Sequence, residues 1–409
     1  MAMNLSNMSS VLKTRYLGPI REQLNNAKIL MAKIGRQDQM VSGKDFTVPL
    51  HTTRNTSAGT AIGDGDTLPT AGQQGYTTTV VPNKYLYGRL EVTGPTIAAS
   101  RDNVGAFVEA LNSEVEGLQR DFERVFNRQL NGDGSGALAY WTGADDTSGT
   151  NVDDSLGNPH HHLYSSGTYD IVDASDDSAF VGEDIVITLG AATSTCVAVT
   201  WTGTVSGSAD ADYVIIANTK QKEMMGIQGV ISDADVKLSS GATSLQGLAV
   251  ATNTFWKAQA FGSYTSMVPI AFEDIQEMID AIATNSDYTE DDIDFLFSNY
   301  GVRRAYYKLC IAERRAVNTM ELDGGFSAVE FNGLPWVVDS QGKRNTINAV
   351  VTDTMKIYRT SDFDWMEKDG SYLNRVANKD AYEATLFHYG NLASLSRNGN
   401  GVLKGVLEA

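Results

Sequence analysis

Three adjacent histidines and several acidic segments are the side chains best suited to binding a metal. The histidines at 160–162 could ligate one, but neighbouring loop side chains diverge and no second cluster has ligand spacing. The acidic segments 145–146, 176–177 and 290–294 lack the alternate-residue pattern and central glycine of a calcium loop. We therefore expect solvated charge at these segments, no metal site and no cofactor.

Sequence motifs for phosphate binding or nucleophilic catalysis are absent. Gly43-Lys44 and Gly342-Lys343 lack the spaced glycine of a P-loop, and no dinucleotide fingerprint follows a strand. Residues 134–136 (Gly-Ser-Gly) only superficially resemble a nucleophile elbow and are interpreted as a helix exit. Paired carboxylates need only spatial proximity, but no feature of the sequence indicates a pair. We predict no catalytic residues and no enzymatic activity.

Length and composition indicate a soluble protein with more than one packed unit. The 409 residues exceed one ordinary core and predict about two or three units. No run of about 18 apolar residues predicts a membrane span, and basic residues interrupt the N-terminal apolar stretches, so no secretory signal is expected. Cys196 and Cys310 lie in apolar stretches, which indicates core residues in a reducing compartment.

The charge is strongly negative but unevenly distributed. A net charge of −18 argues against a general nucleic-acid binder, which needs clustered Lys and Arg. The first 44 residues nevertheless carry seven basic and two acidic side chains, whereas 145–184 and 285–294 are acidic. The basic segment could contact acidic surface on a neighbouring copy, face nucleic acid, or form a solvated helix.

The first 95 residues predict two elements without cores of their own. Residues 8–35 have a narrow, broken helical stripe that needs a surface supplied from elsewhere. Lys44–Thr53 and Tyr76–Thr93 alternate as strands do, and the polar segment Arg54–Gly75 joins them. Because so long and polar a hairpin cannot bury enough surface to be stable alone, we expect a loop or a contact with another molecule.

A long amphipathic helix and a β-rich segment follow. Apolar residues at spacings of three and four predict a helix from about 101 to 130, lying against a sheet. Ser100 or Asp102 is expected to cap it and Gly132 to end it. The composition shift at 137–218 predicts an inserted β-domain. Its expected strands are Tyr169–Val172, Asp184–Leu189, Cys196–Trp201 and Tyr213–Ala217.

Helices and strands alternate in the last part of the chain. Helices are expected at 271–284 and Val302–Ala312, the second following a buried strand at Asp294–Ser298. Asn332-Gly333 predicts a tight hairpin. The strands expected here are Phe326–Phe331, Leu334–Val338, Thr346–Thr352, Met355–Arg359 and Ala381–Tyr389.

The order of these elements resembles the Hong Kong 97 fold of the major capsid proteins of tailed bacteriophages. The residues that carry the resemblance are the strand Phe295–Asn299 before the helix with Arg303 and Arg304, the hairpin Gly324–Asp339 with Gly333-Leu334-Pro335 and Asp339, Asp362–Trp365, and the closing strand with Tyr389–Leu392. The order of elements matches over nearly the whole chain, whereas the match of individual residues lies mainly within 290–400.

The resemblance implies an α+β subunit with seven segments. The expected boundaries are 1–43 for an N-terminal arm, 44–95 for an extended β-hairpin loop, 96–136 for a spine helix and the start of a peripheral domain, 137–218 for the inserted small β-domain, 219–270 for a further peripheral segment, 271–380 for a mostly axial domain, and 381–409 for closing strands of both domains.

The resemblance also implies a function and partners. The chain would self-assemble as hexamers and pentamers of the icosahedral head enclosing phage double-stranded DNA, which it would meet only by non-specific proximity. Portal and scaffolding proteins, and a decoration or cement protein, would be partners, and no membrane would be. Assembly would occur in the bacterial cytoplasm and the product would be the virion capsid. Candidate subunit-interface residues are Arg15, Arg21, Lys28, Lys33, Arg54, Asp64, Asp66, Lys84, Tyr85 and Tyr87.

Three alternative functions stay open at this point. An encapsulin nanocompartment shell shares this architecture, but encapsulins are typically shorter and lack such an insertion. A secreted β-rich enzyme or adhesin belongs to a different class, and the missing signal and catalytic motifs weigh against it. A phage tail or decoration protein would usually lack the long helix.

Overall fold

The computed structural model describes most of the chain. The described residues are 29–34, 45–95, 104–144, 148–153, 163, 167–173, 179–192, 196–203, 205, 212–234, 244–264, 266–313, 319–322, 326–367 and 373–409. The predicted helix up to residue 28, its basic side chains, the helix cap at Ser100 or Asp102, and the histidines at 160–162 lie outside them. Within these ranges, no helix has the length and apolar character needed to cross a membrane.

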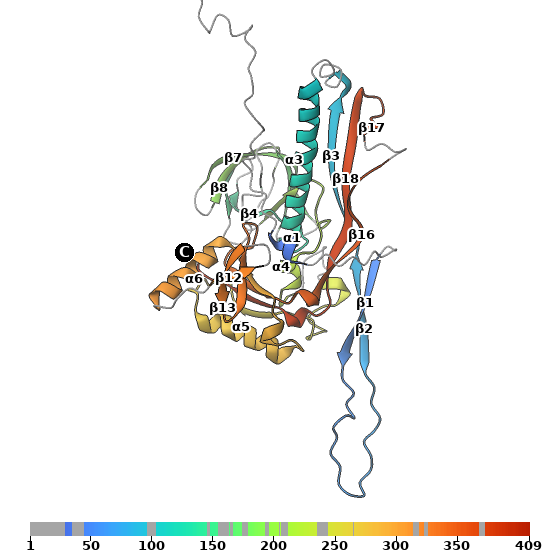
Figure 1. Ribbon diagram of the computed structural model, residues 1–409, viewed down its shortest axis with the longest axis vertical. Helices are drawn as coiled ribbons and strands as arrows, with labels where there is room; N and C mark the ends of the chain where they lie inside the picture. Colours follow the sequence, from blue (N-terminus) through green and yellow to red (C-terminus); the bar gives the residue numbers. More distant parts are fainter. Residues whose placement is uncertain are drawn as a thin grey trace, which may run out of the picture.

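The predicted hairpin exists, but its second strand is shorter than expected. β1 (Asp45–Thr53) pairs antiparallel with β2 (Gly75–Pro82), and the two project well beyond the body of the protein (Figure 1). β3 (Lys84–Thr93) is a separate strand that pairs with β18 (Ala381–Ser394). The expectation of one strand over 76–93 was therefore wrong. Pro82 has no N–H to donate, which makes it a natural end for the hairpin ladder.

β3 and β18 belong to a long sheet that the main helix covers. β16 (Met355–Trp365) and β17 (Asn374–Arg375) also pair with β18. The helix α3 (Val104–Asn131) runs along β3 (Figure 1), and the rings of Phe122 and Phe126 lie 5.2 and 5.1 Å from the ring of Phe363. The prediction of a long helix lying against a sheet is confirmed, as is its end just before Gly132.

A second sheet forms the body of the protein. Its strand order is β10 (Gln259–Gly262), β19 (Gly401–Lys404), β15 (Thr346–Val350), β11 (Phe295–Ser298), β14 (Leu334–Val338), β13 (Phe326–Phe331) and β12 (Thr319–Leu322). The helices beside it are α5 (Phe272–Asn285) and α6 (Tyr300–Ala312), and the short turns include α4 (Ile227–Val230), η2 (Leu245–Gly247), η3 (Glu290–Asp292), η4 (Thr352–Thr354) and η5 (Arg397–Gly399).

This sheet is buried on both faces because successive side chains alternate between two cores. Leu296 and Trp336 pack on the side of α5 and α6. Phe295 and Phe297 point to the opposite side, where α1 (Ile29–Lys33) and the end of α3 complete the core. Cys310 is 2% exposed in the first of these cores, as predicted. The side chain of Cys196 lies outside the description.

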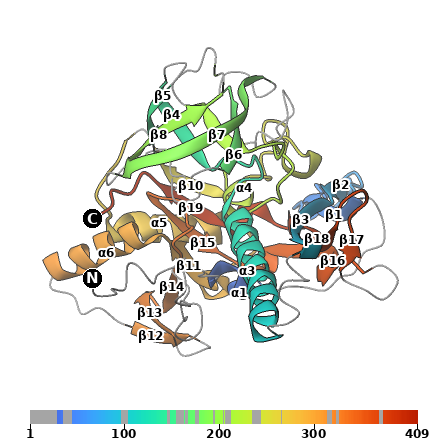
Figure 2. The same ribbon diagram turned by 90° about the horizontal axis from the view of Figure 1, so that it is seen from above.

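The β-rich segment closes into a barrel of its own, standing to one side of the sheet (Figure 2). The strand order around it is β4 (Ala139–Ala144), β5 (Ser148–Asp153), β8 (Cys196–Thr202), β7 (Phe180–Ala192), β6 (Gly167–Val172) and β9 (Tyr213–Ile216). All four predicted strands are present, and β4 and β5 were missed. Leu138, Ile171 and Ile187 are among the residues of a core separate from the other two.

The turn at the end of α3 depends on one glycine. A Cβ added to Gly226 would lie within 2.6 Å of the Leu130 carbonyl oxygen, and closer still to those of Gln129 and Gly132. We therefore expect Gly226→Ala to lower the free energy of unfolding by about 1–3 kcal/mol through overpacking. Urea denaturation would measure it, with Gly117→Ala as the control.

Gly117 lies on α3 with nothing within 4 Å of an added Cβ. Its replacement by alanine should stabilise the helix by about 0.5–1 kcal/mol, since glycine is entropically unfavourable there. Equal stabilities for the two alanine variants would contradict the close-packed turn.

Candidate functional site

The hairpin tip between β1 and β2 has no core. Leu68 is 78% and Ile62 is 44% exposed, although both are large apolar side chains. The loop is nevertheless held closed at its base, because the Asn55 side chain donates from Nδ2 to the Gly72 carbonyl oxygen at 3.0 Å. The predicted interface residues Asp64 and Asp66 are exposed on this tip. The tip therefore presents apolar and charged groups to solvent far from the body.

The root of the hairpin, in contrast, is firmly attached. Phe46 is 3% exposed and its ring stacks 5.6 Å from that of Tyr358 on β16. The Asn391 amide donates to the Pro82 carbonyl oxygen at 2.8 Å, and the Asn83 amide donates to Thr360 Oγ1 at 3.1 Å. A fixed root and an uncovered tip make the hairpin an arm held in a defined direction.

Lys84, a predicted interface residue, is bound within its own chain. Its Nζ donates to the Gln221 carbonyl oxygen at 2.6 Å. Burial lowers the pKa of Lys84, and the nearby carboxylate of Glu223 opposes that shift. Glu223 also accepts from Arg128 Nη1 at 3.0 Å, in an ion pair that is buried on both sides. Lys84 therefore joins β3 to the segment that follows the barrel.

Tyr85 and Tyr87, also predicted, lie on the face of the long sheet that α3 does not cover. They are 56% and 55% exposed. Tyr389 lies between them, with ring centroids at 5.2 and 5.8 Å, and Phe387 is its neighbour at 4.8 Å. The Tyr87 hydrogen bond, followed by burial, raises the pKa of Tyr389 to about 12. The sequence analysis placed Phe387 and Tyr389 in a strand but did not identify them as interface candidates, although their alternation resembles that of Tyr85 and Tyr87.

The remaining predicted interface residues lie in the N-terminal arm (residues 1–43) or line a groove. Arg15, Arg21 and Lys28 lie outside the described residues, while Lys33 is half-buried in the last turn of α1. α1 buries Leu30 against α3, and the Met31 N–H donates to Asn127 Oδ1 at 3.1 Å. For residues 29–34, the surface that the stripe needs is thus supplied by the same chain.

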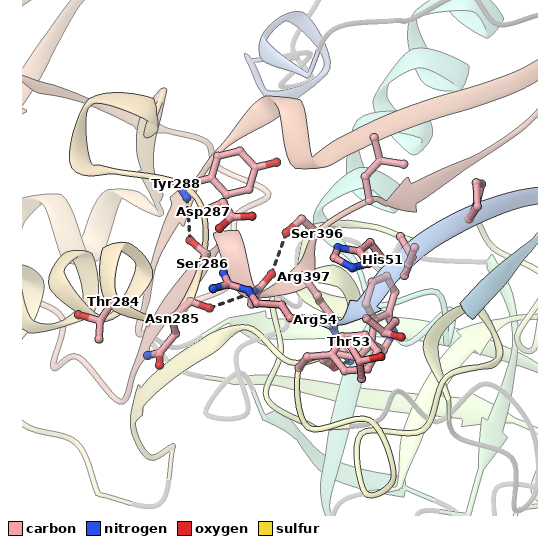
Figure 3. Close-up of a pocket in the computed structure, with 17 residues that line it drawn as sticks. His51, Thr53, Arg54, Thr284, Asn285, Ser286, Asp287, Tyr288, Ser396 and Arg397 are labelled. Carbon is pink, nitrogen blue, oxygen red and sulfur yellow. Dashed lines mark hydrogen bonds between the residues drawn. The ribbon is translucent and has the colours of Figure 1, made fainter. Parts of the chain in front are cut away.

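Arg54 lines a groove of about 580 Å³ between the hairpin and the body. Residues 49–54 form one side, and the turn after α5, with Asp287 and Tyr288, forms the other (Figure 3). Arg397 also lines it. Its polar walls are unlike the mostly apolar pockets that bind small molecules. The groove separates the outer end of β1 from the body.

No cluster of three or more His, Cys, Asp or Glu able to hold a metal occurs among the residues that the structure describes. The features that the structure does show are surfaces: an anchored hairpin with an uncovered tip, an exposed aromatic face and a polar groove. All three suit contacts with other protein surfaces better than they suit chemistry on a small molecule.

Neither a protein-family model nor a curated protein sequence matches the chain. Several solved structures, however, are similar to the chain. The chain is similar to the capsid asymmetric unit of cyanophage A-1(L), with a TM-score of 0.61, 10% identity and 99% of each chain covered.

It is also similar to the capsid of a native GTA particle, with a TM-score of 0.52, 10% identity, and 99% of this chain and 100% of the other covered. An encapsulin complex from Synechococcus elongatus matches at a TM-score of 0.48 and 8% identity, with 100% of this chain and 96% of the other covered. The chain has the α+β, Hong Kong 97-like fold of viral capsid subunits, as its sequence predicted.

Proposed function

We propose that this chain is the major capsid protein of a tailed bacteriophage and that its copies assemble into the icosahedral head. The observation that carries the proposal is the hairpin, whose root is anchored by Phe46 and Pro82 while its tip leaves Leu68 78% exposed. Such an arm gains a core only by lying on another molecule. Many modest contacts of this kind add up in a closed shell. The full-length fold similarity to capsid structures supports this role.

In this proposal the parts of the fold take the roles of capsid domains. The long sheet with α3 is the peripheral domain with its spine helix, and the seven-stranded sheet is the axial domain. The barrel is an inserted domain, and β1–β2 with its tip is the extended loop. β3 then belongs to the peripheral domain, because it pairs with β18 along ten residues.

The proposal assigns partners and location as well. Copies would form hexamers and pentamers, with Arg54, Asp64, Asp66, Tyr85 and Tyr87 at contacts between subunits. Portal, scaffolding and decoration proteins would be further partners, and the packaged DNA would lie near the shell without sequence-specific contact. The role is structural rather than enzymatic. Assembly would take place in the host cytoplasm and the protein would end in the virion.

Self-assembly of the purified chain tests this function. We expect sedimentation velocity to show particles of many copies, and electron microscopy of the same fractions to show closed shells. The reason is that tip and aromatic face lose their exposed apolar surface only in the assembly. A chain that sediments as a monomer at every protein concentration would contradict the proposal.

A further inference from the structure

One helix presents an unusual surface to solvent. Tyr300, Arg304, Lys308 and Ile311 fall at spacings of four, four and three on α6, which puts them on one side of the helix. Ile311 is 73% and Tyr300 is 37% exposed, and the two basic side chains between them are exposed as well. We call these four residues the basic face. Figure 2 shows α6 reaching outward from the edge of the body.

The basic face is held in a fixed form. Arg304 Nε donates to the backbone oxygen of Ala409 at 2.7 Å, while the residue stays exposed. The guanidinium of Arg303 lies 5.1 Å from the ring of Tyr300 and adds a third positive charge. Asn299 caps the helix by accepting from the Val302 N–H at 3.1 Å. A stiff helix with exposed apolar ends and a basic middle fits an acidic protein surface.

Such an acidic surface exists at the other end of β11. Asp287, Asp291, Asp292, Asp294 and Asp353 are exposed, and we call them the acidic edge. Three of them act on Tyr288, whose pKa is raised first by burial and then by the charges of Asp353, Asp287 and Asp292. Within the described part of the chain, no ion pair uses any of these five carboxylates. Among the residues that the structure describes, no cation therefore pairs with these carboxylates to offset their mutual repulsion.

The two surfaces lie on opposite flanks of the subunit. Asp294 immediately precedes β11, and α6 begins directly after it, so they leave the sheet at opposite strand ends. Asp287 lines the groove beside β1, which puts the acidic edge on the flank of the hairpin. Figures 1 and 2 both show α6 on the side away from that hairpin. The two surfaces cannot meet within one chain.

We propose that the basic face of one copy binds the acidic edge of a second copy, head to tail. Opposite surfaces on opposite flanks repeat from copy to copy, and such a contact closes into a ring when its rotation allows. A symmetric pairing would instead put like charges together, which costs stability. The contact would also cover Ile311. The inference rests on the proposed shell function and names the contact within each ring.

Charge reversal tests the contact on the full chain. The reversed-face variant carries Arg304→Glu and Lys308→Glu, and the reversed-edge variant carries Asp287→Lys, Asp291→Lys and Asp353→Lys. Asp292 and Asp294 are left unchanged because they accept hydrogen bonds from Thr289 and Thr352. Sedimentation velocity at about 0.1 M salt would measure the assembled fraction, because charges closer than about 10 Å still interact at that salt concentration. We expect the assembled fraction of each variant to be about tenfold lower than that of the parent.

A variant that restores assembly distinguishes the loss of the intersubunit contact from misfolding of the subunit. All five changes in one chain should restore assembly, because the face is then net negative and the edge net positive. The matched control is Arg375→Glu with Lys379→Glu, the same charge change on exposed residues of β17 and of the turn between β17 and β18; it should assemble as the parent does.

Normal assembly of both reversed variants would overturn the inference while the shell function stands. Loss of assembly that the combined chain does not restore would overturn it as well. A parent chain that never assembles would overturn the proposed function together with the inference.

Discussion

Arg397→Met is expected to lower the free energy of unfolding by about 4 kcal/mol or more. Arg397 is 0% exposed and donates to four backbone carbonyl oxygens: Val230 at 2.9 Å, Trp256 at 3.1 Å, Gly229 at 3.1 Å and Ala234 at 2.8 Å. Methionine has a similar length but no donor. These buried oxygens would lose their charged partner, and each buried polar group left unpaired costs about 1–3 kcal/mol.

Urea denaturation followed by circular dichroism would measure the loss. Arg397→Lys keeps the charge but replaces a planar fork by a single ammonium, so we expect an intermediate loss. Arg375→Met, at an exposed position, should change stability by no more than about 0.5 kcal/mol. An Arg397→Met chain as stable as that control would mean that the four bonds do not hold the body together.

The second large effect concerns assembly rather than folding. Replacing residues 54–74 by Asn-Gly joins Thr53 to Gly75, which already face each other in the β1–β2 register, through a favoured hairpin turn. The subunit should keep its melting temperature, because the removed tip contributes nothing to the described cores. The assembled fraction should fall by about tenfold or more, since many copies of the same contact are lost together.

A matched variant separates tip length from tip chemistry. Ile62→Ser with Leu68→Ser keeps the full loop but removes its exposed apolar groups. We expect weaker assembly from it, between that of the parent and that of the shortened chain. Sedimentation velocity would measure the assembled fractions. Shells of normal size and yield from the shortened chain would show that the tip is dispensable.

Elements set by local patterns could be predicted from the sequence. The stripe Ile275, Met278, Ile279 and Ile282 identifies α5, and all four side chains are buried. Asn332-Gly333 identifies the β13–β14 turn, where φ is +48° and +83°. Both signals come from neighbouring residues, so no distant contact is needed to read them.

Strands that depend on partners distant in the sequence could not be predicted from the sequence. β5 (Ser-Gly-Thr-Asn-Val-Asp) has little strand propensity and exists because β4 and β8 pair with it in the closed barrel. β3 was predicted as a continuation of the hairpin strand, because the alternation of side chains does not reveal which strand pairs with it. Its partner β18 lies near the other end of the sequence.

The candidate site also contains residues recognisable from local patterns and residues that only distant contacts bring together. Tyr85 and Tyr87 were recognisable as aromatic residues of an alternating strand, and the structure adds Tyr389, which lies 302 residues after Tyr87. Lys84 was predicted as a subunit-interface residue, and its Nζ donates to the Gln221 carbonyl oxygen of its own chain. The acidic segment 285–294 was recognisable in the sequence, but its position opposite the basic face depends on β11, which separates the two.

Electron cryomicroscopy of particles assembled from the purified chain tests the central claim most directly. We predict closed icosahedral shells in which residues 45–82 of each subunit extend from their own body onto a neighbouring one. Particles that never form, or shells in which the hairpin tip lies on its own subunit, would contradict the account.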